Sequence, residues 1–200
     1  MSLTPERKAK IEKVLSSKQP DLTVVLENVH DPHNTSAVLR TCDAVGVLDV
    51  HIVTTIPPSK YRLGKKSSAS AKKWLEIHYW DSLTECFTQI REEGKSIMAS
   101  CLHDKAYGLY EMDTTQPVAL VFGNEHRGIS EDAFNQCNGL FSIPQHGMIE
   151  SLNISVACAV TLYEAYRQRQ KKGFYNSPQL DGQRLQELSN AWENKKGKMK

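Results

Sequence analysis

The segment Glu27–Asn34, followed six residues later by Arg40, has residue types that bind an anion at the start of a helix. An apolar run of five residues precedes the segment, and helically spaced apolar residues follow it. Free N–H groups at a helix N-terminus attract anions, and a guanidinium in an apolar stretch needs an anionic or polar partner. A structural explanation is also open, in which Asn34 lies near the helix cap and Arg40 pairs with a nearby acid.

Two further loops carry polar residues directly after apolar runs. Residues 122–130 place Gly123 and Glu125 after the most apolar run, and glycine lets the backbone approach a ligand closely. The loop before the longest helical pattern contains Ser151 and Asn153. The structural alternatives are a solvated turn for the second loop and helix capping for the third.

Alternating strands and helices must position these loops. The predicted strands are 22–26, 47–54, 74–79, 96–102, 118–122 and 140–143, and the predicted helices are 4–18, 33–45, 82–94, 130–137 and 152–172. This alternation predicts an α/β fold with a mostly parallel sheet flanked by helices. Ligands bind beyond the carboxyl ends of the strands in such folds, and all three loops follow strands.

The composition excludes several classes of protein. Among 200 residues, 40% are hydrophobic and 24% charged, as in ordinary globular proteins. No apolar run approaches the roughly 18 residues of a membrane span. The N-terminal residues are charged and lack the apolar region of a signal peptide, so we expect none. Five widely spaced cysteines without a C-x-x-C pair indicate a reducing compartment, so we predict a cytoplasmic protein.

Two kinds of ligand site are not expected. His30 and His33 lie three residues apart, but no further Cys or His cluster completes a metal site, so no metal is predicted. No Gly-rich dinucleotide fingerprint follows a strand, and no Walker A loop occurs. The absence of a Gly-rich first loop also argues against the usual Rossmann methyltransferases.

Positive charge is concentrated in three segments. Residues 1–20 contain five Lys/Arg and two Glu, residues 60–73 contain six Lys/Arg and no acid, and residues 164–200 contain nine Lys/Arg and four acids. Separate basic segments suit a polyanion such as RNA, because each neutralised phosphate releases counterions. Solvated tails and a solvated loop are the alternative.

The chain is predicted to contain three parts. Residues 1–20 form a basic N-terminal helix, residues 21–173 form the central domain, and residues 174–200 form a basic C-terminal tail or helix. Within the central domain, residues 57–73 are rich in Lys, Ser and Gly and are predicted to form a loop. Within the tail, one amphipathic helix is predicted from the spacing of Leu180, Leu185, Leu188 and Trp192.

Taken together, the three polar loops resemble the signature motifs of the SPOUT RNA 2′-O-methyltransferases. In chain order the matching segments are LENVHDPHNTSAVLRTCDAVGV, VFGNEHRGIS and IPQHGMIESLNISVACAVTLYEA, within roughly residues 7–172. The opening QPDLTVVLENVHDPHN and the single N-terminal helix are most similar to the TrmH type, which methylates guanosine 18 of tRNA.

The resemblance implies features that spacing alone does not give. It implies a deep trefoil knot in the C-terminal half, S-adenosylmethionine bound there by backbone groups, and a homodimer whose active site uses both protomers. The implied catalytic residues are Asn34, Arg40, Glu125, Ser151 and Asn153. The residues implied by position to contact the cofactor are Ser100, Gly123, Ile143 and Leu152.

The implied reaction transfers a methyl group from S-adenosylmethionine to a ribose 2′-hydroxyl, at guanosine 18 in the tRNA D-loop. The hydroxyl must lose or share its proton in the transition state. Arginine, with a pKa above about 12, does not accept that proton at neutral pH. Either the site lowers this pKa, or Arg40 stabilises the developing alkoxide while a phosphate or water takes the proton. We favour the second.

The other implied catalytic residues have supporting parts in this scheme. Asn34 is expected to orient Arg40 or the ribose, and Glu125 to orient Arg40 or hold the loops of the knot. Ser151 and Asn153 are expected to shape the loop around cofactor and ribose. Two other functions stay open: a related 2′-O-methyltransferase acting on rRNA or the tRNA anticodon loop, and a non-catalytic RNA-binding protein on the same fold.

Overall fold

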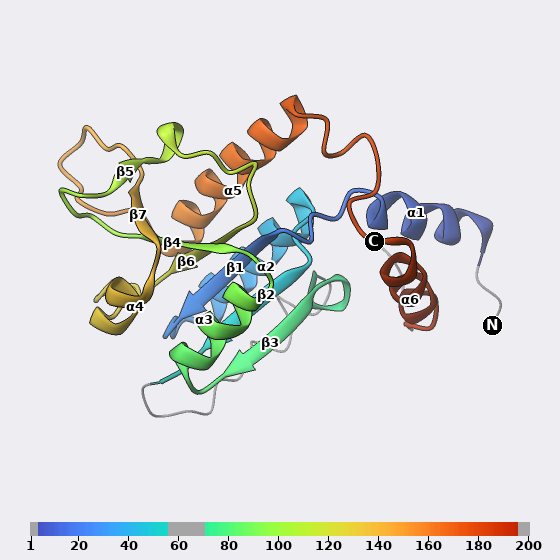
Figure 1. Cartoon of the computed structure of the whole chain (residues 1–200), viewed down its shortest axis with the longest axis horizontal. Helices are drawn as coiled ribbons and strands as arrows, with labels where there is room; N and C mark the ends of the chain where they lie inside the picture. The colour runs from blue at the N-terminus through green and yellow to red at the C-terminus, as the bar shows by residue number, and fades with distance from the viewer. Residues whose placement is uncertain (1–3, 56–70, 196–200) are drawn as a thin grey trace.

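The structure, a computed structural model, describes residues 4–55 and 71–195 and contains one seven-stranded sheet (Figure 1). Its order is β3-β2-β1-β6-β4-β7-β5, and every neighbouring pair is parallel. The strands are β1 (Leu22–Glu27), β2 (Asp49–Val53), β3 (Glu76–Trp80), β4 (Ser96–Ser100), β5 (Tyr107–Gly108), β6 (Val118–Phe122) and β7 (Gly139–Ser142). The predicted α/β class with a mostly parallel sheet is confirmed.

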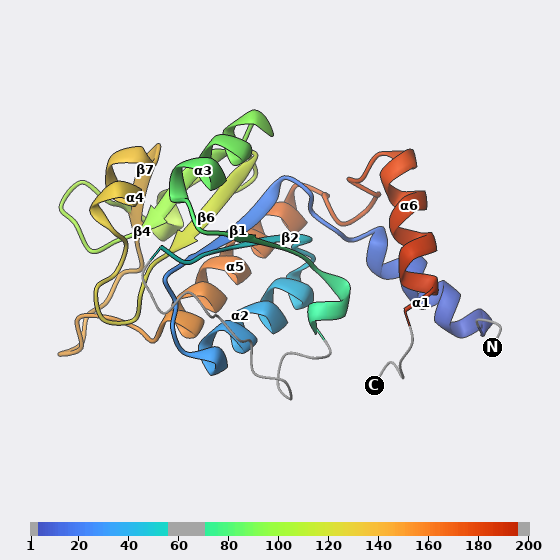
Figure 2. The same ribbon diagram turned by 90° about the horizontal axis from the view of Figure 1, so that it is seen from below.

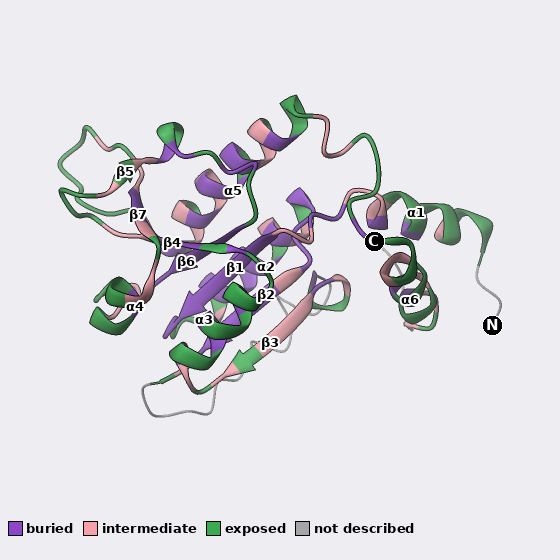
Figure 3. Ribbon diagram, viewed as in Figure 1, coloured by how far each residue is buried: buried purple, intermediate pink, exposed green. Residues whose placement is uncertain are grey.

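Helices cover both faces of the sheet. They are α1 (Pro5–Leu15), α2 (Pro32–Val45), α3 (Leu83–Glu92), α4 (Glu131–Gln136), α5 (Ile154–Lys171) and α6 (Gly182–Glu193), with short 3₁₀ turns η1 (Ala71–Trp74) and η2 (Leu109–Glu111). Figure 2 shows α2 and α5 side by side on one face, with α3 and α4 on the other. Both faces of β1 and β6 are therefore buried (Figure 3). No helix in residues 4–55 and 71–195 is long and apolar enough to cross a bilayer.

Most predicted boundaries lie within a few residues of the observed ones, and the differences have local causes. The first helix ends at Leu15 rather than residue 18, because Ser17 and Lys18 form tighter turns. Trp74 belongs to η1, so the third strand begins at Glu76. Of the predicted loop 57–73, residues 71–73 also belong to η1 and the remainder lies outside the described residues. The two-residue β5 was not predicted, because it is too short to show an alternating pattern.

The first and last helices pack against each other at one end of the molecule (Figure 1). Trp192 of α6 is almost fully buried, and its ring meets that of Trp74 edge-on at 5.1 Å between centroids. The ammonium groups of Lys18 and Lys195 lie 5.6 and 5.7 Å from the centre of the Trp192 ring. The amphipathic helix predicted near the C-terminus is thus confirmed, and it docks on α1.

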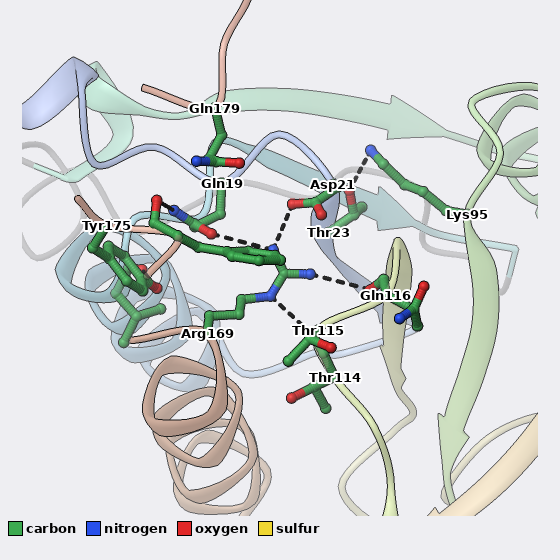
Figure 4. Close-up of polar contacts among 12 residues, drawn as sticks. Gln19, Asp21, Thr23, Lys95, Thr114, Thr115, Gln116, Arg169, Tyr175 and Gln179 are labelled. Atoms are coloured by element: carbon green, nitrogen blue, oxygen red, sulfur yellow. Dashed lines mark hydrogen bonds and ion pairs between the residues drawn. The ribbon is translucent and has the colours of Figure 1, made fainter. Parts of the chain in front are cut away.

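Arg169, near the end of α5, is completely buried and joins three distant parts of the chain (Figure 4). Its guanidinium forms an ion pair with Asp21, just before β1, and donates to the side chain of Gln19. It also donates to the backbone carbonyls of Thr114 and Gln116, before β6. A buried charge is tolerated only when paired and hydrogen-bonded, and these contacts meet that condition.

A stack of rings lies across β2 and β3, where His51 pairs with His78 in the sheet register. The two imidazole centroids are 4.8 Å apart, and Trp80 donates from Nε1 to Nδ1 of His51 at 2.9 Å. The Nε2 atom of His51 is buried and has no hydrogen-bond partner in the described part of the chain. Burial, and the neighbouring His78, lower the pKa of His51 to about 4. His78 instead has a raised pKa, because it is hydrogen-bonded to Asp49.

We expect His51 to make the fold less stable in acid. Its pKa is below the unfolded value of 6.5, so the unfolded chain binds more protons as the pH falls from 6.5 to 4. The loss from His51 is roughly 3 kcal/mol at most. His78 offsets part of it, because its contribution is present below the unfolded pKa and is lost as pH rises through the folded one. Denaturant unfolding of wild type and His51→Gln at pH 4–7 measures this, and equal pH dependence of the two would contradict it.

Candidate active site

A cavity of about 360 Å³ lies at the carboxyl ends of β4, β6 and β7, where a parallel α/β sheet binds ligands. Loops after these three strands and the start of α5 form its walls. All four residues predicted to contact a cofactor line it, namely Ser100, Gly123, Ile143 and Leu152. The predicted catalytic residues Glu125 and Ser151 line it as well.

A chain of side-chain hydrogen bonds joins the three polar loops. The Nδ2 atom of Asn153 donates to Oδ1 of Asn34 at 3.1 Å. The Nδ2 atom of Asn34 in turn donates to Oε1 of Glu125 at 3.1 Å. Three of the five predicted catalytic residues therefore meet, although up to 119 positions separate them in the sequence.

Capping explains part of this arrangement. Asp31 is the N-cap of α2 and accepts from the His33 N–H, so Asn34 is not needed for capping and its amide reaches the other loops. Asn153 is the N-cap of α5 and still binds Asn34, because an amide oxygen accepts while its nitrogen donates. Ser151 is exposed and does not cap this helix. Capping alone is therefore wrong as an explanation of Asn34, and incomplete for Asn153.

Glu125 is held ionised by its surroundings. Burial alone would raise its pKa, but hydrogen bonds from backbone N–H groups, among them those of His30 and Asp31, and from the Asn34 side chain outweigh burial and lower it. Glu125 belongs to the loop after β6, and its carboxylate accepts hydrogen bonds from the loop after β1. It therefore fixes these two loops relative to each other. Its contacts are with Asn34 and backbone, rather than with Arg40 of the same chain.

The loop after β6 has a tight backbone course. A Cβ atom on Gly123 would lie 2.2 Å from the carbonyl carbon and oxygen of Gly128, so no other residue fits there. Asn124 follows, and its Oδ1 accepts from the N–H groups of His126 and Arg127. Sequence analysis did not single out Asn124, which also lines the cavity. This contact could have been predicted, because an Asn side chain in a turn commonly accepts a hydrogen bond from the backbone N–H two residues further along the chain.

Arg40 is not brought to the cavity within one chain. It is exposed on α2, and in the described part of the chain it forms neither a hydrogen bond nor an ion pair. Positions six apart on an α-helix point about 120° apart, so the side chains of Asn34 and Arg40 diverge. The alternative in which Arg40 pairs with a nearby acid finds no such pair among residues 4–55 and 71–195.

The cavity walls offer backbone groups and uncharged side chains more than metal ligands. Within the described residues, no group of three or more His, Cys, Asp or Glu side chains is arranged to hold a metal ion. All five cysteines are free. The cavity instead has the size of a small-molecule site, with two glycines and several backbone amides along the loop after β6.

Residues 21–163 match the SpoU rRNA Methylase family. The chain belongs to this family. It is 45% identical to a tRNA (guanosine(18)-2′-O)-methyltransferase of Thermus thermophilus over 94% of this chain and 96% of that protein. Its structure is similar to that of the TrmH/SpoU tRNA modifying enzyme of A. aeolicus, with a TM-score of 0.87, 35% identity and coverage of 94% and 95% of the two chains.

The SpoU methylases use S-adenosylmethionine, and the cavity fits this group. A similar structure is the AdoMet-bound rRNA methyltransferase of Sinorhizobium meliloti, with a TM-score of 0.62 and 26% identity over 78% of this chain and 59% of that one. In this SpoU chain the bare backbone of Gly123 packs closely against the backbone of Gly128 and Ile129, and this contact sets the course of the loop that lines the cavity. Ser100, Gly123, Ile143 and Leu152, the residues expected to contact this group, all line the cavity.

Proposed function

We propose that this chain transfers a methyl group from S-adenosylmethionine to the ribose 2′-oxygen of guanosine 18 in the D-loop of tRNA. The relative from Thermus thermophilus, matched over nearly its whole length, carries this activity in its name. The observation that carries the proposal is the hydrogen-bonded chain Asn153–Asn34–Glu125 at the edge of the cofactor cavity. A non-catalytic RNA-binding protein would not need this arrangement beside such a cavity.

The side chains of the site then have distinct tasks. When bound, S-adenosylmethionine supplies a methyl group on a positively charged sulfur, which makes that methyl electrophilic. Asn34, held between Asn153 and Glu125, presents a fixed amide to the ribose. Ser151 stands at the wall of the cavity. Glu125 stays ionised and, through its hydrogen bonds, keeps the loops after β1 and β6 together.

Arg40 completes the site from a second copy of the chain. It stabilises the alkoxide that develops on the 2′-oxygen, while an RNA phosphate or a water takes the proton. Its exposed position on α2 beside α5 supports this assignment, because one chain leaves it outside the cavity. A guanidinium keeps its charge at neutral pH and is suited to hold an oxyanion through two N–H groups.

The face formed by α2 and α5 is the proposed dimer interface. Val156 and Tyr163 on α5 are 47% and 54% exposed, an unusual amount for apolar side chains at helical spacing. Ala37 and Ala44 flank Arg40 on α2 and are also exposed. Small residues beside large apolar ones suit the close packing of two helix pairs. A C₂ interface uses the same patch on both protomers, so an Arg40 that reaches its partner's cavity on one side does so equally on the other.

Three further assignments belong to this proposal. The C-terminal half forms a trefoil knot, as the resemblance of the three motifs to the SPOUT methyltransferases implies. Residues 21–173 form the methyltransferase domain, between the basic parts 1–20 and 174–200. The protein works in the cytoplasm, where tRNA is found and free cysteines such as all five here stay reduced.

The basic parts at both ends of the chain form one surface for tRNA phosphates. The N-terminal helix packs on α6, and Lys195 donates from Nζ to the carbonyl of Lys73, which brings η1 alongside. Lys8 and Lys10 are exposed on this surface. Lys18 is buried under Trp192 instead and is excluded from RNA contact.

We expect tRNA affinity to fall steeply with salt and α1 lysines to account for part of the slope. Replacing Lys8 and Lys10 by alanine should flatten the log–log dependence of affinity on salt by about one for each lost phosphate contact. Arg91→Ala on α3 is the matched control. Filter binding from 50 to 300 mM salt, roughly the range over which such contacts weaken, measures the slope. An unchanged slope in the double variant would show that α1 does not contact the tRNA phosphates.

The function itself is tested by mass spectrometry of tRNA after incubation with the protein and labelled S-adenosylmethionine. A label at guanosine 18, absent from tRNA already methylated at that 2′-oxygen, supports the proposal. A label in the anticodon loop, or in rRNA offered in parallel, assigns the chain to another target of the same reaction. Calorimetry that finds no binding of S-adenosylmethionine would favour the non-catalytic alternative.

A further inference from the structure

Asn28 has an uncommon backbone at the end of β1. Its φ is +52°, the only positive value for a non-glycine residue in the described part of the chain. Asparagine adopts this left-handed conformation more readily than other non-glycine residues, yet at a cost. The residue is 5% exposed and does not line the cavity. A buried, strained residue one strand away from a site often serves that site.

The side chain of Asn28 holds this backbone against Thr55. Its Oδ1 accepts from the N–H of Thr55 at 2.9 Å, and its Nδ2 donates to Oγ1 of Thr55 at 3.0 Å. Its own backbone N–H donates to the carbonyl of Val53 at 2.9 Å. The carboxamide and the backbone of Asn28 are therefore held against the end of β2.

The carbonyl of Asn28 faces the opposite neighbour. It accepts from Nδ2 of Asn124 at 2.8 Å, and Asn124 holds the turn to Gly128 through its side chain and backbone. The far end of the same loop is also attached to β1, because the buried Glu27 accepts from the Ser130 N–H at 3.0 Å. The last residue of β1 and the residue after it thus hold the cavity loop at both of its ends.

We propose that Asn28 is a positioning residue for the cofactor loop. Its contact with Thr55 keeps the left-handed turn, the turn aims its carbonyl at Asn124, and Asn124 sets the course of the loop that lines the cavity. Asn28 acts through Asn124 and does not touch the cofactor itself. The inference rests on the proposed function, because it assigns S-adenosylmethionine to this cavity.

Two substitutions separate the parts of this link. Asn28→Gly keeps the left-handed backbone at little cost but loses the side-chain hydrogen bonds to Thr55. It should raise the Kd for S-adenosylmethionine about tenfold and leave the Kd for tRNA near wild type, since small misplacements of a site have large effects. Thr55→Val loses only the Oγ1 contact and should give a smaller rise, and Thr55→Ser should behave as wild type.

Calorimetry for each ligand and thermal unfolding of each variant provide the readout. The two substitutions act on one link, so the double variant should bind S-adenosylmethionine no more weakly than Asn28→Gly alone. Wild-type cofactor affinity in Asn28→Gly would overturn the inference, as would equal losses for cofactor and tRNA with a lowered Tm. Should Asn28→Gly not fold, unchanged cofactor affinity in Thr55→Val would overturn it. Failure of the wild-type protein to bind S-adenosylmethionine would instead refute the proposed function.

Discussion

Arg40→Lys is expected to lower kcat for tRNA methylation by about 100-fold or more, the usual effect of removing one donor to a developing oxyanion. Lysine keeps the charge but lacks the planar pair of N–H donors. The Kd for S-adenosylmethionine should stay unchanged, because Arg40 does not line the cavity of its own chain and is assigned to the ribose oxygen rather than to the cofactor. Single-turnover methylation and calorimetry measure the two quantities separately, and near-full activity of the variant would show that the geometry of the fork is unimportant.

Mixed dimers test whether Arg40 acts across the interface. One chain carries Arg40→Ala and an intact cavity, and the other carries Gly123→Ala and an intact Arg40. Each homodimer should be inactive, whereas the mixed dimer has one complete site and should recover up to about half of the wild-type activity. Two different affinity tags isolate the mixed dimer. A mixed dimer without activity would place Arg40 and the cavity of one site on the same chain.

Gly123→Ala is expected to weaken S-adenosylmethionine binding by about 100-fold or to prevent folding. The added methyl would lie 2.2 Å from the backbone of Gly128 and 2.3 Å from the nitrogen of Ile129, and backbone moves far less easily than a side chain. The loop must shift, and the cavity wall shifts with it. Calorimetry and circular dichroism distinguish the two outcomes.

Gly147→Ala is the matched control for this substitution. It lies in the loop between β7 and α5, and a Cβ there would meet only the nitrogen of Ile149, at 3.9 Å. It should bind the cofactor as wild type does. Wild-type binding by Gly123→Ala would mean that the loop after β6 is adaptable and that its close approach to Gly128 has no bearing on the cavity.

The strand ends could be predicted from sequence because their patterns are local. The run Val118–Phe122 is uniformly apolar and forms the buried β6. Ser130 is the N-cap of α4, and serine is a preferred residue at that position. The same reasoning placed Gly123 and Glu125 at a strand end. The left-handed φ of +88° at Gly46 likewise follows from its place after a helix.

The contacts between loops could not be predicted in the same way. Asn34 and Asn153 meet only because α2 and α5 pack on one face of the sheet, and no local pattern encodes which helices become neighbours. The count of charged residues likewise did not show which cations are exposed. Lys18 and Arg169 were counted among the basic segments, yet both are fully buried. Burial of a cation depends on tertiary partners such as Asp43 and Asp21.

The buried guanidinium of Arg169 sets a condition on biosynthesis. The ribosome synthesises its acceptors Gln19 and Thr114 well before Arg169 itself. A nascent polypeptide that ends before this point has carbonyls and a carboxylate with no cation between them. The finished arrangement therefore awaits translation of residue 169, and products truncated before it should be recognised as unfolded by cellular quality control.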